Sequence, residues 1–232
     1  MEKLIRGIVD FRKNIRPSYK ETFARLALGQ RPDTLFIACS DSRVVPNFFA
    51  SSNPGDLFVI RNVGNLIPPC GADGFSSADE SEAAAIEFSL LNLPITDVIV
   101  CGHSECGAMA QIASGKPLGN APNLKNWLRH GEKGFTKLNA GKSKLGGHLE
   151  LHNQLSQINV LEQIEHLKSY PIVSERFNQG RLRLHGWWFD IKEAEVCNYD
   201  AKQAKFRVID DEYVKSLVGT PPGKSPEKGS PF

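Results

Sequence analysis

The stretch TLFIACSDSR, residues 34–43, decides the fold. Its first half is a short, continuously apolar run, which is typical of a strand buried on both faces of a parallel sheet. LFVIRN (57–62) and DVIVCG (97–102) have the same character, and a helical segment, 77–93, lies between them. Strands that alternate with helices require crossover connections. We therefore expect an α/β fold with a mostly parallel central sheet flanked by helices.

The segments outside these strands complete the expected architecture. Residues 1–30 read as two amphipathic helices separated near Pro17, which form a helical arm. Residues 148–170 read as one long helix. Its predicted apolar stripe consists of Leu151, Leu155, Ile158, Leu161 or Val160, Ile164 and Leu167. The segments 181–191, 193–199 and 204–210 read as strands, in an antiparallel edge or a hairpin meander.

The domain organisation is simple. We expect residues 1–218 to form a single domain, because no linker or internal repeat divides them. Residues 219–232 are rich in Pro, Gly, Ser and charge, and we expect them to form a disordered tail.

Composition excludes several classes of protein. The net charge is only +2, and the Lys and Arg residues are scattered, so we expect no nucleic-acid partner. No apolar run is long enough to cross a bilayer, so we expect no membrane partner. An odd number of cysteines, five, and no secretory signal argue against a disulfide framework. We therefore expect a cytoplasmic protein with reduced thiols.

Two segments carry the chemistry, and each follows a predicted buried strand. They are ACSDSR (38–43) and CGHSECGAM (101–109). In parallel sheets, binding residues gather beyond the carboxyl ends of the strands, so Cys39 can lie beside His103 and Cys106. Two thiolates and one imidazole suit zinc and leave a fourth position open for water. The sequence predicts one zinc ion per chain.

The residues around these ligands indicate how such a site would work. If the chain stays extended after Cys39, the two-residue period places Asp41 and Arg43 on the same side. Asp41 could then accept a hydrogen bond from metal-bound water while Arg43 keeps it ionised. Alternatively, Asp41 fills the fourth position and closes the site. Gly102 and Gly107 would allow close backbone approach, and a helix should begin near Cys106.

The other cysteines and histidines have no metal-ligand spacing, and we expect structural roles for them. They are Cys70, Cys101, Cys197, His130, His148, His152, His166 and His185.

Four blocks, in order, make the sequence resemble the β-class carbonic anhydrases. The family's Cys-x-Asp-x-Arg signature is present as residues 39–43, and its His-x-x-Cys as residues 103–106. PGDLFVIRNVGNLIPP (54–69) resembles the family's connecting segment, and LHGWWFDI (184–191) its late Gly-Trp strand. The resemblance runs from the N-terminal helices to about Val208. Four matching blocks are far more specific than either short motif.

The resemblance implies a zinc lyase that catalyses the reversible hydration of carbon dioxide to bicarbonate and a proton. Cys39, His103 and Cys106 would bind the zinc, and zinc-bound hydroxide would be the nucleophile. Asp41 and Arg43 would act as the catalytic pair. In a closed form of some family members, the equivalent of Asp41 binds the zinc directly.

The resemblance also implies a substrate pocket, partly across a subunit interface. Gln30, Phe58 and Val63 would line it, with Phe88 nearby and the Gly107 backbone N–H as a further donor. Phe88 stands where many relatives have Tyr, so a hydroxyl group is missing there. The family's assemblies imply a homodimer or homotetramer, with the N-terminal helices embracing a neighbour.

Two alternatives remain open at this point. The same site could hydrolyse carbonyl sulfide or carbon disulfide, which are also small linear electrophiles. The chain could also be a non-catalytic, zinc-stabilised assembly protein, although an intact Asp41 and Arg43 argue against a purely structural site. Phe36 stands where some bacterial relatives carry the Trp of a regulatory bicarbonate site, so we expect no such site here.

Overall fold

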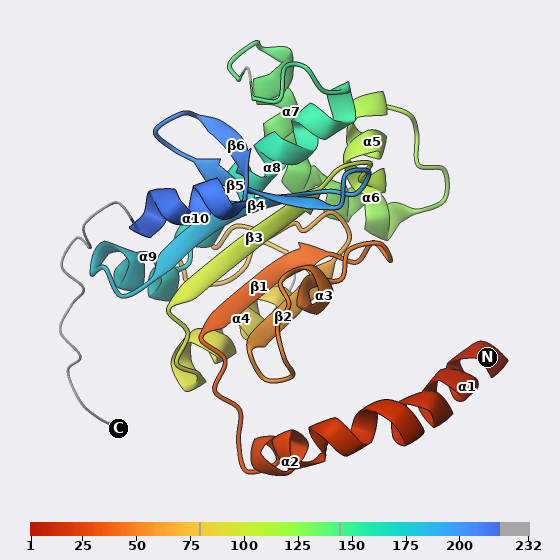
Figure 1. Cartoon of the computed structure of the whole chain (residues 1–232). Coiled ribbons are helices and arrows are strands. Elements are labelled where there is room, and N and C mark those ends of the chain that lie inside the picture. The colour runs from red at the N-terminus through yellow and green to blue at the C-terminus, as the bar shows by residue number, and fades with distance from the viewer. Residues whose placement is uncertain (79, 144, 219–232) are drawn as a thin grey trace.

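One six-stranded sheet forms the centre of the molecule. The computed structural model describes residues 1–78, 80–143 and 145–218. The strand order is β2-β1-β3-β4-β5-β6 (Figure 1). The strands are β1 (Thr34–Cys39), β2 (Leu57–Asn62), β3 (Asp97–His103), β4 (Arg183–Asp190), β5 (Glu195–Asp200) and β6 (Lys205–Val208). The strands β2, β1, β3 and β4 are parallel to one another. Strand β5 is antiparallel to β4, and β6 is antiparallel to β5. The predicted mostly parallel sheet with an antiparallel edge is confirmed.

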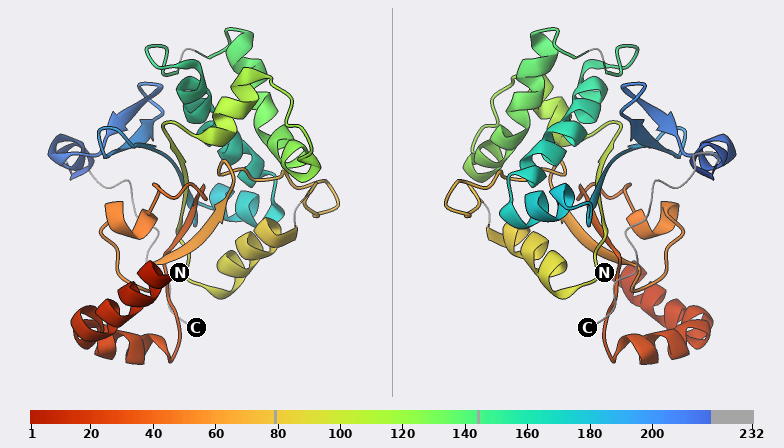
Figure 2. Two further views of the ribbon diagram at one scale, coloured as in Figure 1. Left: turned by 90° about the vertical axis from the view of Figure 1, so that its right-hand side faces the viewer. Right: turned by 90° about the vertical axis from the view of Figure 1, so that its left-hand side faces the viewer.

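Helices flank the sheet, most of them on one face (Figure 2). That face carries α4 (Glu80–Asn92), α5 (Gly107–Ser114), α6 (Pro122–Leu128), the 3-10 turn η2 (Arg129–Gly131), α7 (Glu132–Asn139), α8 (Leu151–Lys168) and α9 (Pro171–Asn178). The short α3 (Pro46–Phe49) lies on the opposite face. After β6, α10 (Asp211–Val218) lies beside the β5–β6 hairpin, where the Tyr213 hydroxyl accepts a hydrogen bond from Asn198 at 2.8 Å.

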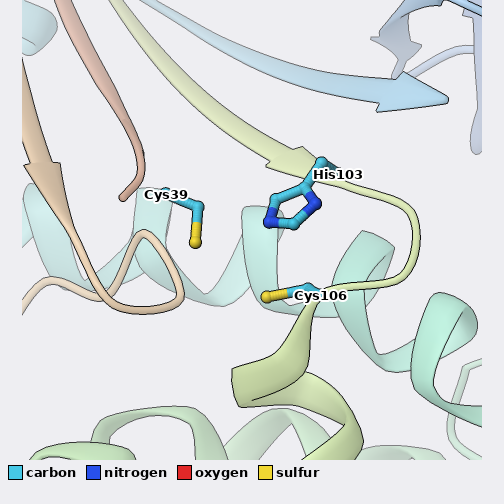
Figure 3. A group of neighbouring side chains, drawn as sticks. All are labelled: Cys39, His103 and Cys106. Carbon is cyan, nitrogen blue, oxygen red and sulfur yellow. The ribbon is translucent and has the colours of Figure 1, made fainter. Parts of the chain in front are cut away.

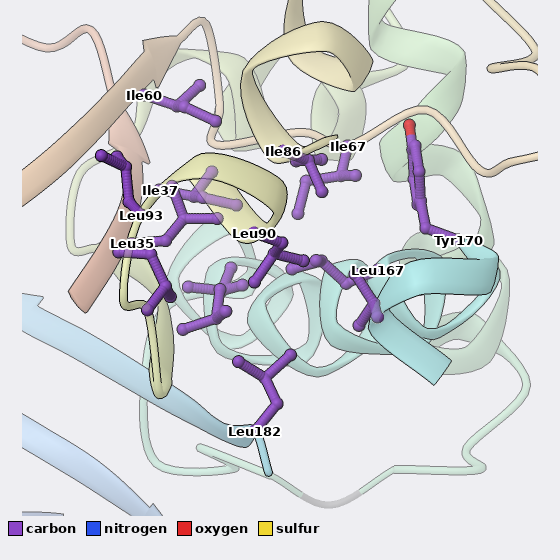
Figure 4. Packing of buried hydrophobic residues seen from close by; sticks show 14 of the residues in the cluster. Leu35, Ile37, Ile60, Ile67, Ile86, Leu90, Leu93, Leu167, Tyr170 and Leu182 are labelled. Carbon is purple, nitrogen blue, oxygen red and sulfur yellow. The ribbon is translucent and has the colours of Figure 1, made fainter. Parts of the chain in front are cut away.

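Strand β1 is buried on both faces, as its uninterrupted apolar sequence predicts. Leu35 and Ile37 pack into the main core with Ile86 and Leu90 of α4 (Figure 4). Phe36 belongs to a second cluster on the other side of the sheet. The alternation of side chains along a strand therefore fills two cores from one segment.

Helix α8 differs from the single apolar stripe that its sequence predicts. Leu151, expected in the stripe, is 45% exposed, whereas six polar residues of the helix are buried. The buried polar residues are Asn153, Ser156, Gln157, Asn159, Glu162 and Gln163. The reason is its position, because α8 contacts β3 and β4 on one side and α5 and α7 on others. A helix surrounded in this way must bury polar side chains, and most of these bond to neighbouring segments of the chain.

The N-terminal arm is almost continuous helix and extends away from the sheet (Figure 1). It consists of α1 (Glu2–Asp10), a π-helical turn η1 (Phe11–Ile15) and α2 (Arg16–Leu26). None of these residues is buried. The helix boundary predicted near Pro17 is confirmed, because α2 begins at Arg16 with Pro17 in its first turn, where its missing N–H costs little. The π-helical turn joins the two helices without a non-helical break.

Two further sequence predictions concern membrane-spanning helices and the C-terminal residues. Within residues 1–78, 80–143 and 145–218, no helix combines the length and the apolarity that crossing a membrane requires. The predicted tail, 219–232, lies outside the described residues.

Asp97 stabilises the amino-terminal end of the sheet, and its loss should have a pH-dependent cost. Its carboxylate accepts hydrogen bonds from Arg183 Nε at 2.7 Å and from His185 Nε2 at 2.8 Å. Burial raises its pKa, but Arg183, His185 and Thr96 together lower it to about 2. Asp97→Asn should therefore lower the free energy of unfolding at pH 7 by ~1–3 kcal/mol.

The sign of the pH dependence follows from the lowered pKa. The contribution of Asp97 is complete above the ordinary carboxyl pKa of 3.8 and is lost as pH falls through about 2. The difference between the wild type and Asp97→Asn should therefore shrink from pH 5 to pH 3. Urea unfolding at the two pH values measures it, and a constant difference would contradict the assigned role.

Candidate metal centre

Three side chains from separate parts of the chain meet at the carboxyl ends of β1 and β3. Cys39 is the last residue of β1, His103 the last of β3, and Cys106 directly precedes α5. All three are buried, and their potential ligand atoms lie within 4.8 Å of one another. Figure 3 shows both sulfur atoms and one ring nitrogen of His103 directed toward the same point. The structure thus brings together the cluster that the sequence predicts.

The tautomer of His103 leaves one nitrogen available to a metal. Nδ1 lies 2.8 Å from the Ser104 carbonyl oxygen, and because a carbonyl only accepts, Nδ1 must donate. In the neutral ring Nε2 then carries no hydrogen, and it is buried without a hydrogen-bond partner. Metal-binding histidines show this pattern, in which one nitrogen donates to the protein and the other binds the ion.

The two thiols interact, so the pKa of one falls while the pKa of the other rises. Backbone N–H groups of Gly64 and Asp41 donate to Cys39 Sγ at 3.3 and 3.4 Å. The pKa of the Cys39 thiol is lowered to about 4, first by a hydrogen bond from Cys106 and then, against the effect of burial, by His103 and these N–H groups. The same bond and burial raise the pKa of Cys106. Two sulfurs, one of them readily ionised, and an imidazole nitrogen form a donor set compatible with a metal ion.

Polar side chains of α8 hold the loops that carry this cluster. Ser156 Oγ donates to the His103 carbonyl at 2.7 Å, and Asn159 Nδ2 donates to the Gly64 carbonyl at 3.1 Å. Gln163 Oε1 accepts the Ile67 N–H at 2.7 Å. The sequence analysis missed these roles, because polar residues within a predicted helix are usually assigned to its solvent-exposed face.

Gly102 lets α8 approach β3, and a larger residue there should destabilise the protein. A Cβ at this position would lie 2.7 Å from Val160 Cγ2 and 3.2 Å from the Ser156 carbonyl oxygen. Val160 is fully buried and cannot move aside easily. Gly102→Ala should lower the free energy of unfolding by ~1–3 kcal/mol, measured by urea denaturation. Gly7→Ala is the control, since nothing lies within 4 Å of a Cβ there. Equal stability of both variants would contradict this account.

Gly107 does not play the part predicted for it in close packing. Nothing lies within 4 Å of a Cβ built on this residue, so the space beside it is open. The predicted helix start is confirmed, because α5 begins at Gly107 with Cys106 as its N-terminal cap.

Asp41 and Arg43 form a close ion pair, although not in the way that an extended chain would place them. The chain turns after Cys39, and the Val44 N–H donates to the Asp41 carbonyl at 3.0 Å. Arg43 Nε and Nη2 donate to the two carboxylate oxygens of Asp41 at 2.9 and 2.8 Å. The Arg43 guanidinium holds the pKa of the Asp41 carboxyl well below its usual range. Among the described residues, the group that could hold a metal does not include Asp41.

Arg61 supports the same turn from β2. Its Nε donates to the Cys39 carbonyl at 3.0 Å and its Nη2 to the Asp41 carbonyl at 2.7 Å. The sequence analysis missed Arg61. The feature that could have indicated its role is its position near the end of β2, a strand parallel to β1.

A cleft of about 390 Å³ opens beside the cluster. Cys39, Asp41, Val63 and Gly107 are among its lining residues. Val63 and Gly107 are thus placed where the sequence predicts a pocket. Gln30, Phe58 and Phe88 do not line this cleft within one chain. Gln30 is exposed between the arm and β1, and the rings of Phe58 and Phe88 stack with centroids 5.9 Å apart.

A comparison of the sequence with models of protein families shows to which family the chain belongs. The family model described as carbonic anhydrase matches residues 34–196, which is more than half of the chain. The chain belongs to the carbonic anhydrase family. Among curated relatives, carbonic anhydrases of Synechocystis sp. and Pseudomonas aeruginosa are 40% and 36% identical to it. The first alignment covers 92% of this chain and 79% of the relative, and the second covers 97% and 99%.

Solved structures assign the chain to the β class of carbonic anhydrases. The β-carbonic anhydrase CcaA superposes with a TM-score of 0.82 and 40% identity, over 91% of this chain and 92% of that one. A β-carbonic anhydrase of Sordaria macrospora, described as tetrameric, gives a TM-score of 0.74 and 27% identity, over 85% and 95%.

In this β-carbonic anhydrase chain, leucines form much of the wall of the cleft. Leu118, Leu124 and Leu128 line it together with the polar Asp41. Sequence reasoning did not single out these leucines, because no motif marks them.

Proposed function

We propose that the chain catalyses the reversible hydration of carbon dioxide to bicarbonate and a proton, with one Zn²⁺ bound by Cys39, His103 and Cys106. The observation that carries this proposal is the buried, unpartnered Nε2 of His103 between two thiols of which one is readily ionised. The curated relatives that are named carbonic anhydrase support it. Zinc would supply the Lewis acid that makes water a nucleophile near neutral pH.

The chain's own residues would orient the reactants. Asp41, kept ionised by Arg43, would accept a hydrogen bond from the attacking water and fix its direction. This help matters because two thiolates cancel the charge of the dication and weaken it as a Lewis acid. Val63 and the cleft leucines offer an apolar surface to uncharged carbon dioxide. The backbone N–H of Gly107, also at the cleft, would donate to bicarbonate.

We propose further that the pocket is completed in a homodimer or homotetramer, to which Gln30, Phe58 and Phe88 contribute across the subunit boundary. The tetrameric relatives of Sordaria macrospora support an assembly of this kind. The exposed arm, with Leu4 and Ile8 at 65% and 68% exposure, offers an apolar surface for it. We also propose a cytoplasmic location, supported by five cysteines that are all free thiols.

Metal analysis combined with a hydration assay tests the proposal. Zinc per chain is measured on the purified protein, and stopped-flow hydration of carbon dioxide is followed from pH 6 to 9. Chelation should abolish the activity, and added zinc should restore it. Undiminished hydration by the metal-free protein, or none by the zinc-loaded protein, would overturn it. A parallel assay with carbonyl sulfide tests the alternative substrate.

A further inference from the structure

Glu105, between two of the proposed zinc ligands, has a backbone conformation that ordinary residues avoid. Its φ is +55°, in the left-handed region, which is strained for a residue with a side chain. In this conformation its carbonyl oxygen accepts a hydrogen bond from Arg43 Nη2 at 3.0 Å. The strained peptide therefore contacts the Asp41–Arg43 pair directly.

Asn153 of α8 holds Glu105 in this conformation through two bonds. Its Oδ1 accepts the backbone N–H of Glu105 at 2.8 Å, and its Nδ2 donates to Glu105 Oε1 at 2.9 Å. Asn153 is 7% exposed and lies in the first turn of a helix that packs against β3 and β4. It is thus a rigid support, whereas the Glu105 side chain is 55% exposed.

The neighbouring His152 offers a contrast on the same helix. Its Nε2 lies 3.1 Å from Glu105 Oε2, so it contacts only the carboxylate. The backbone N–H of Glu105 instead donates its hydrogen bond to Asn153 Oδ1. Loss of His152 therefore removes a contact with the side chain alone, whereas loss of Asn153 also removes the bond to the backbone amide.

We propose that Asn153 is a positioning residue for the Asp41–Arg43 pair, acting through the backbone of Glu105. This inference rests on the proposed function and adds a residue to it. The Arg43 side chain is 47% exposed, and its bond to the Glu105 carbonyl fixes the guanidinium plane that faces Asp41. Without Asn153 the peptide relaxes, Arg43 turns toward solvent, and Asp41 loses its orientation. None of these atoms is a metal ligand, so zinc stays bound.

Asn153→Ala with His152→Ala as the matched control tests this inference on zinc-loaded enzyme. For Asn153→Ala we expect one zinc per chain and a loss of ~10- to 100-fold in kcat at unchanged KM, because only orientation is lost. For His152→Ala we expect turnover within twofold of the wild type. A double variant, Asn153→Asp with Glu105→Gln, exchanges donor and acceptor between the side chains and keeps an acceptor for the backbone N–H. It should recover most of the lost kcat.

Each outcome decides the matter. Wild-type kcat in Asn153→Ala, an equal loss in His152→Ala, or loss of zinc together with activity would overturn the inference. If Asn153→Ala does not fold, the double variant decides, and low kcat with full zinc in that variant would count against the inference. An inactive zinc-loaded wild type would instead contradict the proposed function.

Discussion

Cys39→Ser is expected to reduce bound zinc to a small fraction of one ion per chain and to bring carbon dioxide hydration close to the uncatalysed rate. The hydroxyl of serine does not ionise near neutral pH, so the site loses the sulfur with the pKa of about 4. Only one sulfur and one nitrogen would remain of a cluster whose atoms lie within 4.8 Å of one another. His103→Asn should have the same effect, because it removes the unpartnered Nε2.

Cys70→Ser is the matched control, since it makes the same change at a half-buried cysteine outside the cluster. It should retain one zinc per chain and full hydration activity. Zinc content is measured by elemental analysis and activity by stopped-flow assay. Equal loss of zinc in both variants would mean that the metal is not held at Cys39.

Asp41→Ala is expected to retain zinc and to lose about 10²-fold or more in kcat. General acid–base groups contribute about 10²- to 10⁴-fold, and removing Asp41 takes away the acceptor that orients the attacking water. The fold should tolerate the change, because Arg43 is half exposed and water can solvate its freed charge. Elemental analysis and stopped-flow hydration measure the two effects separately.

The same variant distinguishes the two roles left open for Asp41. If Asp41 were a fourth metal ligand, its removal would weaken zinc binding, and a chelator titration would show it. Arg43→Lys gives an independent comparison, because lysine keeps the charge but not the paired N–H groups that contact both carboxylate oxygens. It should lose activity without losing zinc, and full activity in Arg43→Lys would contradict the need for this geometry.

The central sheet and the cluster could be predicted because both depend on local patterns. The apolar run in β1 requires burial on both faces, and parallel strands bring their carboxyl ends together. Cys39 and His103 were therefore predictable as neighbours. The turn that joins Asp41 to Arg43 was not, because the Asp41 carboxylate bonds the Arg43 backbone N–H at 3.0 Å and so competes with an extended chain.

The support of the site could not be predicted in the same way. Asn153 and Ser156 bond to backbone groups about fifty residues earlier in the chain, and no periodicity records such contacts. Gln30, Phe58 and Phe88 were assigned by resemblance alone, and contacts between chains leave no pattern within one sequence. Their places in the pocket stay predictions.

The polar bonds of α8 have a consequence for how this chain can vary. A helix in a soluble protein usually accepts exchanges at its polar positions and resists them at its apolar ones. In α8 this difference between polar and apolar positions is partly reversed. Leu151 is exposed, whereas Asn153 and Asn159 bond to the loops at Glu105 and Gly64 beside the metal-ligand cluster. Amino-acid substitutions in this helix are therefore restricted by the loops that it holds as well as by the core. A substitution without effect on stability or activity is easier to make at Leu151 than at either asparagine.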